Sequence, residues 1–283
     1  MVKRQHGVVL TYVNSLAELA DCLGRGGYDT IKVVTGWGVD GGWNPGNMSH
    51  LLRMVPHVIV RTVAGDPSYD NRNPDYRFPD ANRVRDELAP WYAIRQDIMF
   101  EIGNEPNIDD HPSNDFIYGY RWNLNAAFDV CRGTFPQAKL ISPGLMINPG
   151  KDFERFNEIA ADVFRRCDFI GLHFYEDYGF AKAQQRSTTN QLREAIQVAR
   201  RLYADKPWYV TEYGINNCDT MSMGEKGRRY AGMTYYGESD PALPDNVAGL
   251  TYYHLNMKRD FHQQYHIFPD GDSMFGSRLR QAA

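Results

Sequence analysis

The feature that most constrains the fold is a regular alternation of short apolar runs with helical segments. The runs are continuous stretches of β-branched and aromatic residues, which is typical of strands covered on both faces. Strands that alternate with helices predict repeated βα units and a parallel sheet. Eight such runs occur, at residues 8–13, 30–35, 57–63, 98–103, 139–143, 168–174, 208–213 and 247–255.

The segments between the runs carry helix signals. Residues 15–18, Ser-Leu-Ala-Glu, form a capping box that predicts a helix start. Residues 80–96 have apolar positions at helical spacing, and we expect Pro90 to kink or divide this helix. Residues 115–135 and 187–204 show the same spacing, and each segment ends just before a proline-containing turn.

Eight βα pairs within 283 residues leave little room for a second domain. Because α/β barrels run to about 250 residues undivided, we predict a single (β/α)₈ TIM barrel over residues 1–283. The alternative is an open doubly wound sheet, which favours a glycine-rich turn after the first strand. Residues 12–16, Tyr-Val-Asn-Ser-Leu, contain no glycine, so the barrel is preferred.

Charge and hydropathy exclude several classes of partner. A net charge of −4 gives no electrostatic case for nucleic acid or an anionic membrane. No apolar stretch approaches the roughly 20 residues of a membrane span. The apolar run at residues 8–10 is too short for the core of a signal peptide. We therefore expect a cytoplasmic protein, or a secreted one whose signal peptide has been removed.

Cysteine and histidine spacing argues against a metal or a disulfide framework. The four cysteines are far apart and show no metal-ligand spacing, so buried free thiols are expected at Cys22, Cys131, Cys167 and Cys218. His262 and His266 stand four residues apart but lack a third ligand at zinc spacing. We predict no metal and no cofactor.

Two glutamates stand where predicted strands end. Glu105 follows the fourth strand and Glu212 ends the seventh. The carboxyl ends of barrel strands form the rim at which barrel active sites assemble. Paired carboxylates suit glycoside cleavage, because one acts protonated as an acid and the other acts ionised. A separation of about 5–5.5 Å gives retention, and a wider gap gives inversion.

The motifs around these glutamates, Asn104-Glu105-Pro106 and Thr211-Glu212-Tyr213-Gly214, resemble those of the clan A glycoside hydrolases. That superfamily includes cellulases, mannanases, xylanases, β-xylosidases and β-galactosidases, and the eight-strand pattern extends the resemblance over nearly the whole chain. The resemblance implies a retaining β-glycoside hydrolase with Glu105 as acid/base and Glu212 as nucleophile. It also implies that Asn104 binds the sugar 2-hydroxyl. The alternative is that both glutamates are rim charges or structural partners of arginines.

Arg61 lies inside the third apolar run, and a buried charge requires a partner. The resemblance implies an arginine that keeps the nucleophile ionised, although clan members usually carry it on an earlier strand. The alternative is a salt bridge to Glu101, which we expect to be structural. His173 and Tyr175, two residues apart, point to the same side of the sixth strand. The resemblance implies that the tyrosine contacts the nucleophile and the histidine lies near the sugar; the alternative is an ordinary polar strand end.

Aromatic residues suggest where a sugar could stack. Trp37, flanked by glycines after the second strand, is a candidate subsite, whereas we expect the segment from Tyr118 to Trp122 to serve helix packing. Clan A members commonly present a tryptophan on the eighth strand. Here Tyr253 or His254 takes that place, or the platform is missing.

The partner predicted from these motifs is therefore a carbohydrate. Glucan, mannan, xylan and galactan are not distinguished, nor is the oligomeric state, and the compact chain favours an open cleft. One alternative function is a non-catalytic carbohydrate-binding barrel. Another is a metal-dependent barrel hydrolase, for which only His173 and His254 stand at strand ends.

Overall fold

Nine parallel strands form one continuous sheet in the order β5-β4-β3-β2-β1-β9-β8-β7-β6. The computed structural model describes residues 5–10, 23, 28–35, 44–67, 77–107, 112–147, 153–177, 197, 200–216 and 246–255. The strands are β1 Gln5–Leu10, β2 Thr30–Val34, β3 His57–Arg61, β4 Met99–Glu101, β5 Lys139–Ile141, β6 Leu145–Met146, β7 Ile170–Asp177, β8 Trp208–Asn216 and β9 Val247–Leu255.

Strands β5 and β6 are two parts of one interrupted strand, and together they close the barrel. Ile141 of β5 forms a parallel bridge to Phe169, and the backbone N–H of Ser142 donates to the carbonyl of Phe169 at 3.1 Å. Asn104, beyond β4, forms a parallel bridge to Gly144. The chain from β5 to β6 thus lies between β4 and β7. The predicted (β/α)₈ barrel is confirmed, with its fifth strand divided.

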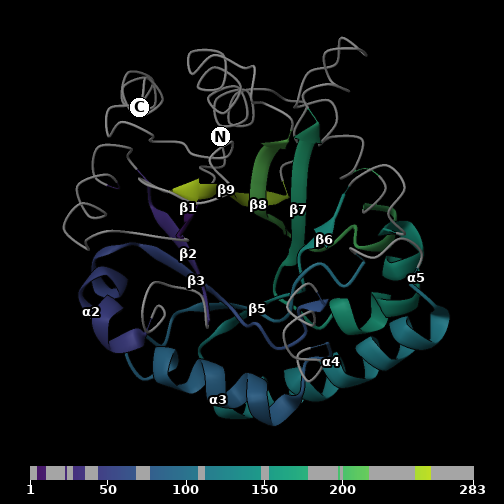
Figure 1. The fold of residues 1–283 in the computed structure, drawn as a ribbon, viewed down its shortest axis with the longest axis horizontal. Helices are drawn as coiled ribbons and strands as arrows, with labels where there is room; N and C mark the ends of the chain where they lie inside the picture. Colours follow the sequence, from purple (N-terminus) through teal and green to yellow (C-terminus); the bar gives the residue numbers. More distant parts are fainter. Residues whose placement is uncertain are drawn as a thin grey trace.

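Helices α2 to α5 of the described residues lie along the outside of the strands in chain order (Figure 1). Polar residues that precede three of them accept hydrogen bonds from the first turn, as sequence capping rules require. These caps are Asn44, Asp80 and Ser113. The helices are α2 Pro45–Met54, α3 Ala81–Tyr92, α4 Asn114–Thr134 and α5 Phe153–Phe164.

Pro90 does not divide α3, although division was one of the two outcomes expected for it. It lies in the last turn, so the helix ends at Tyr92, two residues beyond it and four short of the predicted end. The predicted helix at 187–204 is described only at residues 197 and 200–204, and the capping box at 15–18 lies outside the described residues. Within the described ranges, no helix has both the length and the hydrophobicity needed to cross a membrane.

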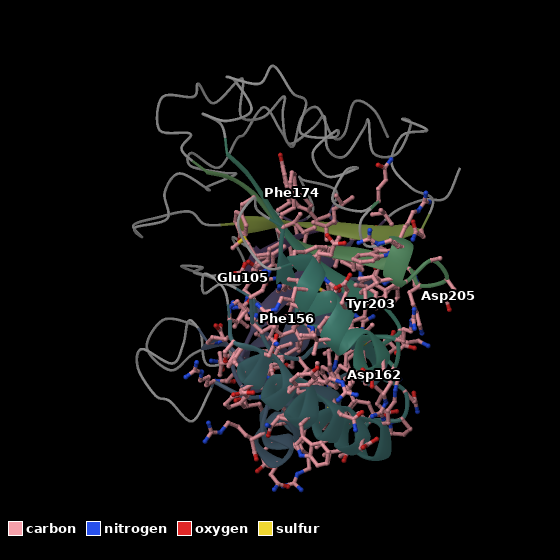
Figure 2. The ribbon with its side chains drawn as sticks, turned by 90° about the vertical axis from the view of Figure 1, so that its right-hand side faces the viewer. Glu105, Phe156, Asp162, Phe174, Tyr203 and Asp205 are labelled. Carbon is pink, nitrogen blue, oxygen red and sulfur yellow. The ribbon has the colours of Figure 1, made fainter. Side chains whose placement is uncertain are left out.

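The main core fills the space between the sheet and the helices. Phe156 of α5 and Tyr203 pack in this layer, whereas Asp162 and Asp205 lie at the surface (Figure 2). Cys131 and Cys167 are buried free thiols there, as predicted. Cys22 and Cys218 lie outside the described residues.

A second, smaller core lies among the strands themselves and positions the polar residues above it. Ile59, Met99, Ile141 and Tyr209 pack together from β3, β4, β5 and β8. Side chains two residues apart on a strand share a face. Arg61 therefore follows Ile59, and Glu101 follows Met99, on the same side of the sheet. The apolar layer is succeeded by a layer of buried charges.

Gly144 is required where β5 passes into β6. A Cβ at this position would overlap Cδ2 and Nε2 of His173 and approach a carboxylate oxygen of Glu101 at 2.8 Å. The absence of a side chain therefore lets the histidine ring lie against the backbone.

We predict that Gly144→Ala lowers the free energy of unfolding by about 1–3 kcal/mol, because overpacking displaces a buried ring. The matched control is Gly133→Ala on α4, where an added Cβ meets nothing within 4 Å and the expected change is below about 1 kcal/mol. Urea unfolding of both variants measures the difference. Equal stabilities would contradict the packing argument.

Candidate active site

The layer of buried charges lies at the carboxyl ends of the strands. Lys32 comes from β2, Arg61 from β3, Glu101 from β4, His173 from β7 and Glu212 from β8. All five side chains are buried, with at most 3% of any residue exposed. The strand order brings them together although they span 180 residues of sequence.

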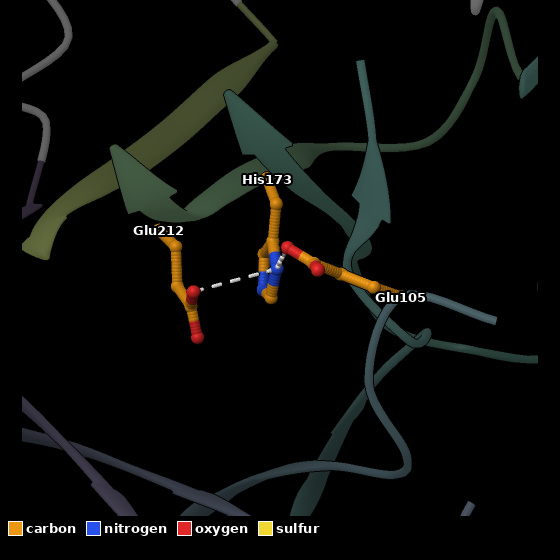
Figure 3. A group of neighbouring side chains, drawn as sticks. All are labelled: Glu105, His173 and Glu212. Atoms are coloured by element: carbon orange, nitrogen blue, oxygen red, sulfur yellow. Dashed lines mark hydrogen bonds and ion pairs between the residues drawn. The ribbon is translucent and has the colours of Figure 1, made fainter. Parts of the chain in front are cut away.

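Glu105 joins this layer from the segment after β4. Its backbone N–H donates to the carbonyl of Gly144 at 3.0 Å, which fixes the segment against the β5–β6 connection. Its φ of 36° makes it the one described non-glycine residue with a positive φ. The residue itself is 6% exposed. Figure 3 shows the carboxyl groups of Glu105 and Glu212 on either side of the His173 ring.

Glu212 is held in its ionised form. Arg61 Nη1 lies 2.6 Å and Lys32 Nζ 3.0 Å from its Oε1, and the hydroxyl of Tyr175 donates to Oε2 at 2.6 Å. Burial alone would raise the pKa of Glu212, but the charges of His173, Lys32 and Arg61 outweigh burial and hold the pKa far below its ordinary value. This carboxylate is therefore suited to act as a nucleophile.

Glu105 is shifted in the opposite direction. Burial raises its pKa, the hydrogen bond to His173 opposes this rise, and the negative charge of Glu212 adds to it. Nδ1 of His173 lies 2.7 Å from Oε1 of Glu105. Two neighbouring carboxyl groups whose environments push their pKa values apart are suited to acid and base roles.

The two carboxyl groups are close enough to act on one atom. One oxygen of each, together with a ring nitrogen of His173, lies within 4.8 Å of the others. Such a set could in principle hold a metal ion. However, Oε1 of Glu212 already contacts two cationic side chains, which disfavours a further cation at that oxygen.

Of the eight residues predicted for the site, six come together. Glu105, Glu212, Asn104, Arg61, His173 and Tyr175 lie in one contiguous cluster. The roles assigned to them stay predictions. Trp37 lies outside the described residues, and His254 is described only as part of the backbone of β9.

Four interactions place the supporting residues. Arg61 pairs with Glu212 and donates from Nη1 to Oδ1 of Asn104 at 2.5 Å. Glu101, for which an arginine partner was considered, pairs instead with Lys32 at 2.6 Å. Tyr175 contacts Glu212 as the resemblance implied.

The expectation that the segment from Tyr118 to Trp122 serves helix packing holds only in part, because Trp122 is 76% and Tyr118 is 54% exposed. Only Tyr120 of the three aromatics is buried, with its hydroxyl donating to the carbonyl of Gly65 at 2.8 Å. The helical period explains this, because Tyr118 and Trp122 lie four residues apart on the outer face.

Sequence reasoning missed Lys32. It is a single lysine within the apolar run 30–35, which is the same signal that identified Arg61 in the next strand. Glu101, its partner, also accepts from Thr211 Oγ1 at 2.7 Å and from the backbone N–H of Gly144 at 3.2 Å. Glu101 is therefore a structural anchor, as expected.

Comparisons with known proteins identify the fold. No family model matches the sequence, and no curated protein sequence matches it. A β-glucuronidase 2 mutant from Bacteroides uniformis matches with a TM-score of 0.63 at 10% identity, over 93% of this chain and 32% of that one. The chain thus spans about a third of that enzyme.

Two other solved structures match along their whole length. A GH128 endo-β-1,3-glucanase from Amycolatopsis mediterranei, solved with laminaripentaose, has a TM-score of 0.56 at 16% identity over 99% of this chain and 100% of its own. An endo-1,4-β-D-mannanase from Thermotoga petrophila has a TM-score of 0.57 at 12% identity over 99% of each chain. These matches show that the chain has the barrel fold of these glycoside hydrolases.

The stability contributed by Glu101 should depend on pH. Burial opposes its charge, but Lys32, His173 and Arg61 outweigh burial and lower its pKa from 4.5 to about 2. Because the folded pKa is depressed, this stabilisation is complete above pH 4.5 and is lost as the pH falls toward 2. We predict that wild type exceeds Glu101→Gln in free energy of unfolding most at pH 7, with the gap closing below pH 4.5.

Urea unfolding between pH 7 and pH 3 measures this gap. The control is Asp162→Asn, which breaks an exposed ion pair with Arg121 on the protein surface and should cost less than about 1 kcal/mol at every pH. A Glu101→Gln gap that stays constant with pH would contradict the assignment of a depressed pKa.

Proposed function

We propose that the protein is a retaining β-glycoside hydrolase that cleaves β-linked oligo- or polysaccharides. The observation that carries the proposal is the buried pair of Glu105 and Glu212, with oxygens within 4.8 Å and pKa values shifted in opposite directions. The resemblance of both motifs to clan A enzymes supports it. So do the names of the structural neighbours, which are glucanases, a mannanase and glycosidases.

In the first step Glu212 forms a bond to the anomeric carbon while the glycosidic bond breaks. Glu105 transfers its proton to the departing oxygen, so that an alcohol leaves rather than an alkoxide. Arg61 and Tyr175 hold Glu212 in place and keep it ionised before the attack. The product is a glycosyl ester on Glu212 and a deprotonated Glu105.

In the second step Glu105 acts as the base. The negative charge of Glu212 has been consumed in the ester, which removes one cause of the raised pKa of Glu105. Glu105 takes a proton from water as the water oxygen attacks the anomeric carbon and Glu212 leaves. Two inversions at one carbon give a product with the configuration of the substrate.

The short separation supports retention rather than inversion. Inverting enzymes need carboxyl groups about 6.5–9.5 Å apart to admit a water molecule between them and the sugar. The oxygens of Glu105 and Glu212 are closer than this. Asn104, fixed by Arg61 and 6% exposed, is proposed to bind the 2-hydroxyl of the sugar.

The first test is hydrolysis of a panel of aryl β-glycosides and β-linked polysaccharides. We predict that wild type turns over at least one member, that Glu212→Gln abolishes turnover, and that Glu105→Gln lowers it about 10²–10⁴-fold. Glu158→Gln on the exposed face of α5 is the matched control and should be unchanged. Proton NMR of the first product reports its anomeric configuration.

Two outcomes of these experiments would contradict the proposal. A folded wild type that binds glycans without cleaving any of them would be a carbohydrate-binding barrel. An initial product of inverted configuration would refute the double displacement.

A second test concerns Tyr175, whose hydroxyl lowers the pKa of Glu212. Removing this donor in Tyr175→Phe should raise that pKa. The acidic limb of kcat/KM, which reports the free nucleophile, should then move to higher pH. Tyr92→Phe is the control, since the Tyr92 hydroxyl accepts from the exposed backbone N–H of Gln137 at 3.3 Å rather than from a group of the site. An unmoved acidic limb would show that Tyr175 does not hold Glu212.

A further inference from the structure

Lys32 contacts three acceptors inside the barrel. Its Nζ lies 2.6 Å from Oε2 of Glu101, 3.0 Å from Oε1 of Glu212 and 3.3 Å from Nε2 of His173. A charged ammonium group has three N–H donors and no acceptor. Because the ammonium group cannot accept a hydrogen bond, its contact with His173 assigns Nε2 the role of acceptor.

Glu101 does not need a proton from His173. Its Oε2 forms an ion pair with Lys32 at 2.6 Å, and its Oε1 accepts from Thr211 Oγ1 and from the backbone N–H of Gly144. Nε2 of His173 lies 3.2 Å from Oε1, farther than the Thr211 hydroxyl at 2.7 Å. The role of Glu101 is therefore to fix the position of Lys32.

We propose that Lys32, anchored by Glu101, keeps the proton of neutral His173 on Nδ1, where it donates to Oε1 of Glu105. The acid proton of Glu105 then resides on the other oxygen, Oε2. Lys32 and Glu101 are positioning residues in this scheme, because they act on Glu105 through the histidine ring. The proposal rests on the proposed function for the role of Glu105.

This arrangement assists both steps of the reaction. While Glu105 is protonated, Nδ1–H donates to a neutral carboxyl oxygen. After the proton leaves, the same N–H donates to a carboxylate, and hydrogen bonds to charged acceptors are roughly twice as strong. The ring thus stabilises the deprotonated form of Glu105 without moving.

The charges around His173 explain why Lys32 matters. The charged groups that face the ring are three carboxyl groups, of Glu101, Glu105 and Glu212, and one ammonium group, of Lys32. Burial and Lys32 lower the pKa of His173, whereas the carboxylates raise it and prevail. Without Lys32, a proton on Nε2 would supply the positive charge that Glu101 loses at that position.

The test follows the ring nitrogens of His173 by NMR in protein labelled with ¹⁵N-histidine. The signal is assigned by its loss in His173→Asn. In wild type above the midpoint of titration, we expect the Nδ1–H tautomer. Lys32→Met should raise the midpoint by at least about one pH unit, a tenfold change in proton affinity. Glu101→Gln, which leaves Lys32 uncompensated, should lower it.

The double variant Lys32→Met/Glu101→Gln guards against loss of folding. It removes one charge of each sign, so its midpoint should lie between those of the single variants. An Nε2–H tautomer in wild type, or a midpoint in the double variant equal to that of Glu101→Gln, would overturn the proposal. If the role of Lys32 were purely structural, both single variants would be less stable, but their His173 midpoints would not shift in opposite directions.

Kinetics separate this proposal from the proposed function. In Lys32→Met a protonated ring stabilises ionised Glu105, so the basic limb of the pH profile of kcat/KM should move to lower pH. The same ring charge replaces that of Lys32 beside Glu212, so the acidic limb should move less. Expected NMR shifts without hydrolysis of any glycan would refute the proposed function and keep the proton assignment. Hydrolysis with an unshifted His173 would refute the proton assignment alone.

Discussion

The structure depends on the matching of charges that lie away from water. Lys32 and Arg61 oppose Glu101 and Glu212 inside the barrel, and an unpaired member would be very costly to bury. Buried ion pairs contribute little net stability compared with apolar residues of the same volume. Their presence is consistent with the proposed chemistry, since the same arrangement lowers the pKa of one carboxyl group and leaves that of its neighbour raised.

Along β3 and β4, the apolar residue that packs in the core and the charged residue of the site are two positions apart and therefore share a face. Ile59 and Met99 pack in the apolar layer, and Arg61 and Glu101 follow them on the same face. The apolar layer fixes the register of the strands, and the register fixes the distances between the charges. A slip of one residue would place every charge on the opposite face.

The sequence was sufficient for the barrel and for most of the cluster, because both follow from local patterns. Continuous apolar runs located the strands, and strand ends located Glu105 and Glu212. The division of the fifth strand was missed because it depends on the His173 ring lying against Gly144, 29 residues earlier in the chain. Lys32 was missed although its apolar run carried the signal, because its partner Glu101 lies on another strand. Trp122 shows that an aromatic at helical spacing can face outward.

Glu105 adopts a left-handed backbone conformation that glycine accepts without cost and other residues accept at about 1–2 kcal/mol. Folding alone would favour glycine at this position, whereas the proton transfer proposed for Glu105 requires a carboxyl group. These two requirements conflict at position 105. A lineage that ceased to use the reaction would gain stability by losing this side chain, so position 105 should be among the first to change when a descendant keeps the barrel for another purpose.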